Sequence, residues 1–179
     1  SYTGATGSPN QYSIDYDAAA NLAGFTDVTN ATLPASPITL TVPAGAPAAT
    51  YNATLTVRNS TSGCVSVSYP ITVTVVALPT VSTGTNPSVC RGTTSALLSF
   101  TTTNSPNQYS INYNSAANTA GFVDVTNAAL PGGGNFILVV PAGAAAGTYN
   151  GTLTVRNSTT GCVSASQNIS VDILAPIVS

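Results

Sequence analysis

Apolar and polar residues alternate along several short segments of the chain, which is the pattern of β-strands that bury one face. In the segment 149–156, Tyr149, Leu153 and Val155 occupy one side and polar residues the other. After a turn at 157–161, alternating apolar positions from Val163 to Ile173 predict the second strand of a hairpin. The same pattern predicts strands at 96–100, 109–113 and 136–140, and at 12–16, 38–42, 51–57 and 65–75 in the first half of the chain.

Two segments depart from this alternation. Residues 17–24 and 114–121 each begin with a capping side chain, continue with helix formers and end at Gly, so each predicts one or two helical turns between strands. Further on, Tyr51 and Tyr149 stand near the start of a late strand. Sandwich domains often place there a tyrosine whose hydroxyl bonds back to the preceding loop. The alternative is a tyrosine that only fills the edge of the core.

The two halves of the chain repeat each other. Residues 8–14 return at 105–111 with a shift of 97, and residues 54–61 return at 152–159 with a shift of 98. A period of this length excludes a solenoid of ~20–50-residue units and fits whole domains. We therefore expect an all-β fold of tandem Ig-like antiparallel β-sandwiches, each with a short helical turn between strands.

The repeat also suggests the domain boundaries. Residues 89–98 have no counterpart before Tyr2, and the final residues resemble the lead from the first copy into the second. We expect 1–77 to be an Ig-like repeat lacking its first strand or strands, 78–175 a complete repeat, and 176–179 the start of a linker to a further repeat. Because the sequence contains no Met and does not begin with a positively charged or apolar leader, we interpret the chain as part of a longer array of repeats.

The amino-acid composition limits the classes of partner that the chain can bind. Charged residues make up 4% of the chain, far below the ~25% of ordinary soluble domains. The abundant Thr, Ser and Asn make a polar but neutral surface instead. Three Arg and a net charge of −2 cannot neutralise a row of phosphates, so we expect no nucleic acid partner. No run of ~18 apolar residues is present, so we expect no membrane insertion.

The chain contains no His, so it lacks the usual general base, the Ser-His-Asp and Cys-His arrangements, and an imidazole ligand for zinc. We expect no catalytic residues, no enzyme activity and no cofactor. Asp15 and Asp17 could place two carboxylates on one face of a strand and are weak calcium candidates, with solvated strand residues as the simpler interpretation. Asp27 and Asp124 recur in Asp-Val-Thr, where a turn-capping hydrogen bond is expected.

The repeat offers an explanation for the odd number of cysteines, which is three. Cys64 and Cys162 occupy matching positions, whereas Cys90 lies in the segment that the first copy lacks. We expect a Cys90–Cys162 disulfide, with Cys64 paired to a cysteine upstream of this sequence. Such bonds indicate an oxidising or extracellular setting. Three buried free thiols are the alternative.

An ordered set of motifs runs through both copies: Ser-Pro-Asn-Gln-Tyr-Ser-Ile-(Asp/Asn)-Tyr, Ala-Gly-Phe-x-Asp-Val, Val-Pro-Ala-Gly, Thr-Tyr-Asn-x-Thr-Leu-Thr-Val-Arg-Asn and Gly-Cys-Val-Ser. This set resembles the Ig-like repeats of giant Bacteroidota cell-surface proteins, of which the flavobacterial gliding-motility adhesins are the best-known carriers. The resemblance covers essentially the whole chain. It implies a bacterial cell-surface filament exported by type IX secretion, with the repeats acting mainly as stalk. The family supplies no catalytic residues.

From these observations we expect structural stalk repeats of a long extracellular surface adhesin or filament, acting in surface adhesion and gliding motility. The expected partners are neighbouring repeats of the same chain, with surface polysaccharide and other filament chains as further candidates. Two alternatives are kept. One is a carbohydrate-binding Ig-like module, against which the core-facing pattern of tyrosines and the lack of Trp both argue. The other is a pilin-like fibre subunit in which the strand missing before Ser1 is donated by another molecule.

Overall fold

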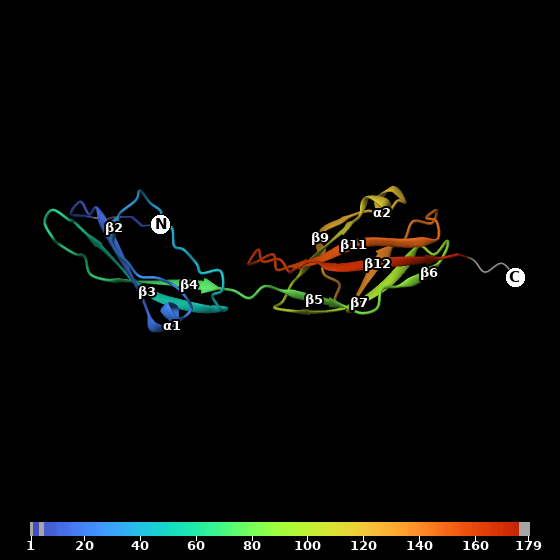
Figure 1. Ribbon diagram of the computed structural model, residues 1–179, viewed down its shortest axis with the longest axis horizontal. Coiled ribbons are helices and arrows are strands. Elements are labelled where there is room, and N and C mark those ends of the chain that lie inside the picture. The colour runs from blue at the N-terminus through green and yellow to red at the C-terminus, as the bar shows by residue number, and fades with distance from the viewer. Residues whose placement is uncertain (1, 4–5, 176–179) are drawn as a thin grey trace. The chain divides into compact units, whose positions relative to one another are not determined.

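A computed structural model gives the structure of residues 2–3 and 6–175 (Figure 1). The chain divides into two units, unit 1 (Ser1–Val76) and unit 2 (Ala77–Ser179). The division falls one residue before the boundary expected from the repeat. The expected linker at 176–179 lies outside the described residues. Each unit is described by itself below.

Unit 2 is a two-layered β-sandwich. One layer is a five-stranded sheet in the order β6-β12-β11-β8-β9, and the other is a three-stranded sheet in the order β10-β7-β5. All paired strands are antiparallel except β6 and β12, which run parallel. The strands are β5 (Thr80–Thr83), β6 (Ser88–Cys90), β7 (Ser95–Thr103), β8 (Gln108–Tyr113), β9 (Val125–Ala129), β10 (Asn135–Val139), β11 (Gly147–Arg156) and β12 (Gln167–Leu174).

The core of unit 2 lies between its two sheets. Phe136 of β10 and Leu98 of β7 face Leu153 and Val155 of β11, and all four side chains are fully buried. The Phe136 ring stacks on Phe100, with ring centroids 4.1 Å apart. The packing of side chains from both sheets confirms the predicted sandwich. The inward row predicted from Val163 to Ile173 holds only from Ile169 onward, because Val163 is 43% exposed and β12 begins at Gln167.

Unit 1 contains a single four-stranded antiparallel sheet among its described residues, in the order β2-β1-β3-β4. It matches β9-β8-β11-β12 of unit 2 strand for strand. Its core is smaller, centred on Ile14, Tyr16, Phe25 and Tyr51. The strands are β1 (Gln11–Tyr16), β2 (Val28–Thr32), β3 (Ala49–Arg58) and β4 (Tyr69–Val75).

A short helix follows the first strand of this sheet in both units, as predicted. Helix α1 (Ala18–Leu22) is capped by Asp17, and α2 (Ser115–Thr119) by Asn114. Each cap side chain accepts a hydrogen bond of 2.8 Å from the third backbone N–H that follows it. The oxygen atom, and not the charge, is therefore what the cap requires, because Asn and Asp perform it with the same geometry.

Two strand predictions are wrong in unit 1. Residues 38–42 match β10 but form no strand, because the described part of unit 1 contains no partner equivalent to β7. The predicted inward row at Val65, Val67 and Tyr69 is exposed instead, with β4 beginning only at Tyr69. After its turn the chain makes only an isolated bridge, Arg58 to Val65, before pairing resumes.

Candidate functional site

The hairpin turn after β11 is held by asparagine side chains. The Asn157 Oδ1 accepts hydrogen bonds from the backbone N–H groups of Thr159 and Thr160, at 3.0 and 3.2 Å. Its Nδ2 donates to the carbonyl of Ser105, at 3.0 Å. Asn107 accepts from the Ser158 N–H at 2.9 Å, which ties the turn to the start of β8. One end of unit 2 is therefore closed by side-chain bonds between segments about 50 residues apart.

Unit 1 repeats these hydrogen bonds and adds one more, from Asn59 to the carbonyl of Gly7. Asn59 accepts from the N–H groups of Thr61 and Ser62 and donates to the carbonyls of Gly7 and Ser8. Asn10 accepts from the Ser60 N–H at 2.9 Å, just as Asn107 does from Ser158. The repeated Asn-Ser-Thr motif is thus a structural lock of each unit, and its side chains are committed to internal bonds.

The predicted corner tyrosines are confirmed. The Tyr149 hydroxyl donates to the carbonyl of Ala145 at 3.0 Å, and the Tyr51 hydroxyl donates to the carbonyl of Pro47 at 2.7 Å. Each ring also packs 4.8 Å from a core phenylalanine, measured between centroids. These tyrosines fix the loop before the longest strand and present no free hydroxyl for a ligand.

The strand tyrosines also belong to the core, as the alternation predicts. Tyr16 and Tyr113 are buried, and burial raises the pKa of both hydroxyls, that of Tyr113 to about 12. Tyr12 and Tyr109 are partly buried against the same cores. None of these four side chains offers an exposed ring for stacking on a sugar.

Three of the five carboxylates accept backbone hydrogen bonds. The Asp27 Oδ1 accepts a hydrogen bond from the Tyr16 N–H at 2.8 Å, and Asp124 accepts one from the Tyr113 N–H at 2.8 Å. Each Asp thus bonds a backbone amide, as predicted, but the amide ends the preceding strand and does not belong to the Asp's own turn. The Asp17 carboxylate accepts from the N–H of Ala20 and from the side chain of Asn52. The hydrogen bond from the Ala20 N–H is the main cause that lowers its pKa, followed by that from Asn52.

The calcium candidates do not form a ligand cage in the described part of the chain. Both oxygens of Asp17 already accept hydrogen bonds, while Asp15 is exposed on β1 opposite Thr54. No group of three His, Cys, Asp or Glu side chains converges among residues 2–3 and 6–175. Calcium binding at Asp15 and Asp17 stays a prediction without a third ligand to support it.

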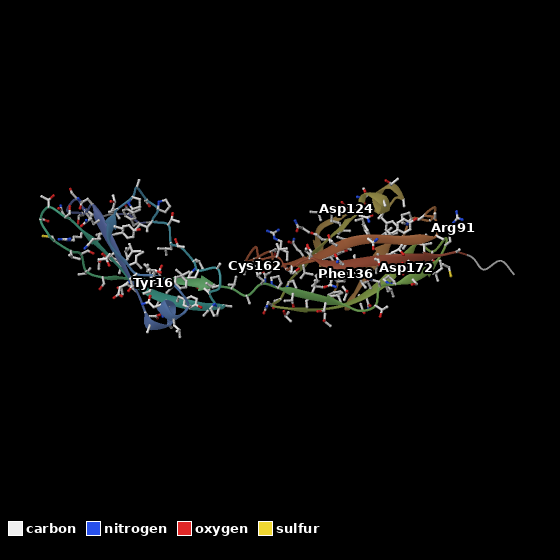
Figure 2. All side chains as sticks on the ribbon, in the orientation of Figure 1. Tyr16, Arg91, Asp124, Phe136, Cys162 and Asp172 are labelled. Carbon is white, nitrogen blue, oxygen red and sulfur yellow. The ribbon has the colours of Figure 1, made fainter. Side chains whose placement is uncertain are left out.

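The predicted Cys90–Cys162 disulfide is wrong for this structure, in which all three thiols are free. Cys90 pairs with Leu174 at the end of β12, whereas Cys162 precedes β12 at the turn. The eight residues of β12 span about 25 Å at ~3.3 Å each, and a disulfide needs Cα atoms within ~7 Å. Figure 2 shows Cys162 and Arg91, the neighbour of Cys90, at opposite ends of unit 2. The upstream partner expected for Cys64 lies outside this sequence.

The chain enters and leaves unit 2 at opposite ends. On entry, the carbonyl of Leu78 accepts a hydrogen bond of 2.7 Å from Asn104, next to the locked turn. From that turn β12 runs the full length of the sandwich and leaves at Leu174, beside β6. Figure 1 shows this course within unit 2, from β5 to the end of β12.

Unit 1 carries an apolar groove on the inner face of its sheet. The groove has a volume of about 220 Å³ and is lined by Tyr2, Ile14, Ile38, Leu40, Leu55, Ile71 and Thr72. The corresponding face of unit 2 is covered by the three-stranded sheet. The groove could not be identified from the sequence, because it forms only when the sheet is folded.

The outer face of the five-stranded sheet of unit 2 is rich in amides. A shallow depression there is lined by Asn112, Asn114, Asn150 and Asn168, together with Thr152. Asn112 and Asn168 lie on either side of Thr152 in neighbouring strands. This surface is flat and open, and no charged side chain lines it.

No helix in residues 2–3 and 6–175 combines the length and apolar character that a membrane span requires. Neither the protein-family profiles nor the curated proteins include a match to this chain. Two solved structures are similar over most of it. The D00-D0 domain of intimin has 15% identity and a TM-score of 0.36, covering 93% of this chain and 87% of that one. The central fibronectin-III array of RIM-binding protein has 14% identity and a TM-score of 0.33, covering 100% of this chain and 63% of that one. At such low scores neither likeness assigns a function.

Proposed function

We propose that the chain is a stalk region of a long extracellular surface adhesin or filament, acting in bacterial surface adhesion and gliding motility. The observation that carries this proposal is the course of the chain in unit 2, which enters beside Asn104 and leaves beyond Leu174 at the opposite end. Units with this connectivity can be joined in series without folding back. The whole-domain repeat supplies such a series.

The surface chemistry supports the same role. A stalk exposed to water needs a polar surface, and this chain provides it almost entirely with Thr, Ser and Asn. Asp27, Asp124 and the asparagines repeated in both units accept backbone hydrogen bonds within their own unit, and no group of three His, Cys, Asp or Glu side chains converges among the described residues. We therefore propose a non-enzymatic protein whose partners are neighbouring repeats.

The reach of the stalk gives a direct test. Each ten-residue strand such as β11 spans about 33 Å, so each added repeat should lengthen the molecule by roughly 30–40 Å. Chains carrying one, two and three further copies of residues 78–175 would be compared by small-angle scattering and electron microscopy. A maximum dimension that grows by this step supports the stalk, and copies that fold back into a compact particle contradict it.

Localisation needs a separate test. Antibodies against this chain should label intact, unpermeabilised cells of the producing organism along extracellular filaments. An antibody against a cytoplasmic protein serves as the control. Labelling that appears only after permeabilisation would refute the surface assignment, and normal adhesion and gliding after deletion would refute the proposed roles.

The amide-rich depression on unit 2 favours a second candidate, a carbohydrate-binding module. Amide groups can donate and accept hydrogen bonds to sugar hydroxyls, although no exposed aromatic ring lies beside them in the depression. A glycan array probed with the chain and with its Asn168→Ala variant tests this alternative. Binding that the variant loses would support it, and no binding by either protein would exclude it for the glycans presented.

A further inference from the structure

Strand β10 lies at one edge of the three-stranded sheet of unit 2, and its outward side chains are apolar. Ile137 and Val139 are 66% and 73% exposed, and Leu97, which lies opposite Ile137 in β7, is 62% exposed. The alternating residues Phe136 and Leu138 fill the core instead. A surface otherwise rich in Thr, Ser and Asn therefore carries an apolar row at this edge.

The other edge strands of unit 2 have features that hinder pairing with a further strand. Strands β5 and β6 contain only four and three residues. Strand β9 has a register shift in its pairing with β8 and contains Asn127, whose φ is positive. By contrast, β10 pairs with β7 over five residues without a shift and contains neither Pro nor a charged side chain. Among the described residues of unit 2, β10 is thus the edge best suited to pair with another strand.

The register shows which backbone groups of β10 are free. The Gly134 carbonyl accepts a hydrogen bond from the Phe100 N–H at 2.9 Å, and the Val140 N–H donates to the Thr94 carbonyl at 3.0 Å. Because bonding alternates along an antiparallel strand, the even-numbered residues of β10 bond to β7 and the odd-numbered ones point away from it. No strand lies on that side among residues 77–175. The residues whose N–H and C=O groups face the open edge are Asn135, Ile137 and Val139.

The first copy of the repeat does not share these features. With the shift of 98 residues, the two apolar outward positions of β10 become Thr39 and Thr41. The first position of the strand becomes Pro37, which has no backbone N–H to donate. The inward positions, by contrast, are apolar in both copies. The repeat therefore requires the inward row, whereas the apolar outward row is particular to unit 2.

We propose that β10 is a docking edge for β10 of a second copy of this chain. The two strands pair antiparallel about a two-fold axis, with Ile137 opposite Ile137 of the second copy. Val139 of each copy then lies opposite Asn135 of the other, and the two three-stranded sheets become one continuous sheet. The proposal does not rest on the stalk role, because it concerns the lateral pairing of chains and not their joining in series.

A second copy fits this edge in both backbone and side chains. Three residues of each strand offer a free N–H and C=O, and the two-fold register pairs these residues with one another across the axis. On the outer face, Leu97 and Ile137 of one copy continue into Ile137 and Leu97 of the other. Cross-strand apolar pairs of this kind stabilise antiparallel strands. The pairing thus creates a continuous apolar row over four strands.

Neither charge nor bulk opposes the pairing. Residues 92–123 and 125–150, which include β7 and β10, contain no charged side chain. The turn before β10 contains Gly132, Gly133 and Gly134, so no side chain there blocks the approach of another strand. Five residues per copy are far fewer than the ~20–30 of a standard interface, so a single contact should be weak. It should also be insensitive to salt, since no ion pair takes part.

The test is sedimentation equilibrium of the full chain. We expect a monomer–dimer equilibrium with a Kd between about 10 µM and 1 mM. This Kd should not change between about 0.05 and 0.5 M salt. Ile137→Lys should weaken the dimer at least about tenfold, because two lysines then lie opposite each other across the axis. Ser82→Lys is the matched control and should dimerise like the parent, since it adds the same charge at an exposed position of β5, the other edge of the same sheet.

Hydrogen exchange followed by NMR locates the contact. The amides of Asn135, Ile137 and Val139 should gain protection as the protein concentration rises. Those of Phe136 and Leu138 already bond to β7, so their protection should not change. No association up to about 1 mM would overturn the proposal. So would equal association of the two Lys variants, or concentration-dependent protection that leaves β10 unaffected.

Discussion

Truncating one leucine of the repeated strand should affect the two units unequally. Leu153 of β11 is 0% exposed between the two sheets of unit 2, and Leu55, its match in β3, borders the open groove of unit 1. A fully buried Leu→Ala change loses the transfer free energy of the removed atoms and leaves a cavity, at a cost of about 3 kcal/mol. At Leu55 the groove is already accessible to water, so we expect a cost of about 1 kcal/mol.

Urea unfolding followed by ¹H–¹⁵N NMR separates the two effects, because the amide signals of each unit report its own midpoint. With a slope of about 1.5 kcal/mol per molar urea, Leu153→Ala should lower the midpoint of unit 2 by about 2 M. Leu55→Ala should lower that of unit 1 by well under 1 M on the same basis. The unaltered unit of each variant is the internal control. Equal shifts, or a larger shift from Leu55→Ala, would refute the open-face description of unit 1.

Three further predictions concern the caps, corners and thiols. Tyr149→Phe removes the hydroxyl bond to Ala145 and should destabilise unit 2 by about 1 kcal/mol or less, measured by the same urea titration; no change would show that the bond contributes nothing. Because the pKa of Asp17 is lowered on folding, its negative charge adds stability to unit 1 above the pKa of the unfolded chain, and this contribution is lost as the pH falls through the lower folded pKa. Asp17→Asn should therefore reduce the acid sensitivity of unit 1 in thermal unfolding, and an unchanged pH dependence would count against this cap. Alkylation without reductant should modify all three thiols, those of Cys64, Cys90 and Cys162, and the partly buried Cys162 should react most slowly. Protection of two of these thiols would instead support the predicted disulfide.

The elements with strong alternation could be predicted from the sequence. Strands β8 and β11 carry clear apolar rows, and the helical turns carry a cap at one end and Gly at the other. Strand β9 was missed because Val-Thr-Asn-Ala-Ala does not alternate. A register shift interrupts its pairing with β8, and Asn127 there has a positive φ of 49°.

The errors at residues 38–42 and at the cysteines have a common physical origin. Alternation reports which side of a segment is apolar, but a strand also needs a neighbour to pair with, and unit 1 has none for this segment in its described residues. A sequence repeat likewise shows which cysteines occupy equivalent positions in the two units, but it does not show which cysteines lie close together in space. Cys90 and Cys162 belong to opposite ends of β12, which only the strand order reveals.

Native-state hydrogen exchange gives the most direct test of the central claim, that unit 2 is a closed sandwich and unit 1 the same sheet with one face open. The amides of the two inward residues of β10 (Asn135–Val139) bond to β7, while those of the matching Ile38 and Leu40 have no strand partner within the described part of unit 1. The account predicts that the two β10 amides exchange at least about a hundredfold more slowly than those of Ile38 and Leu40. Equal protection of the two pairs of amides in the isolated chain would contradict it.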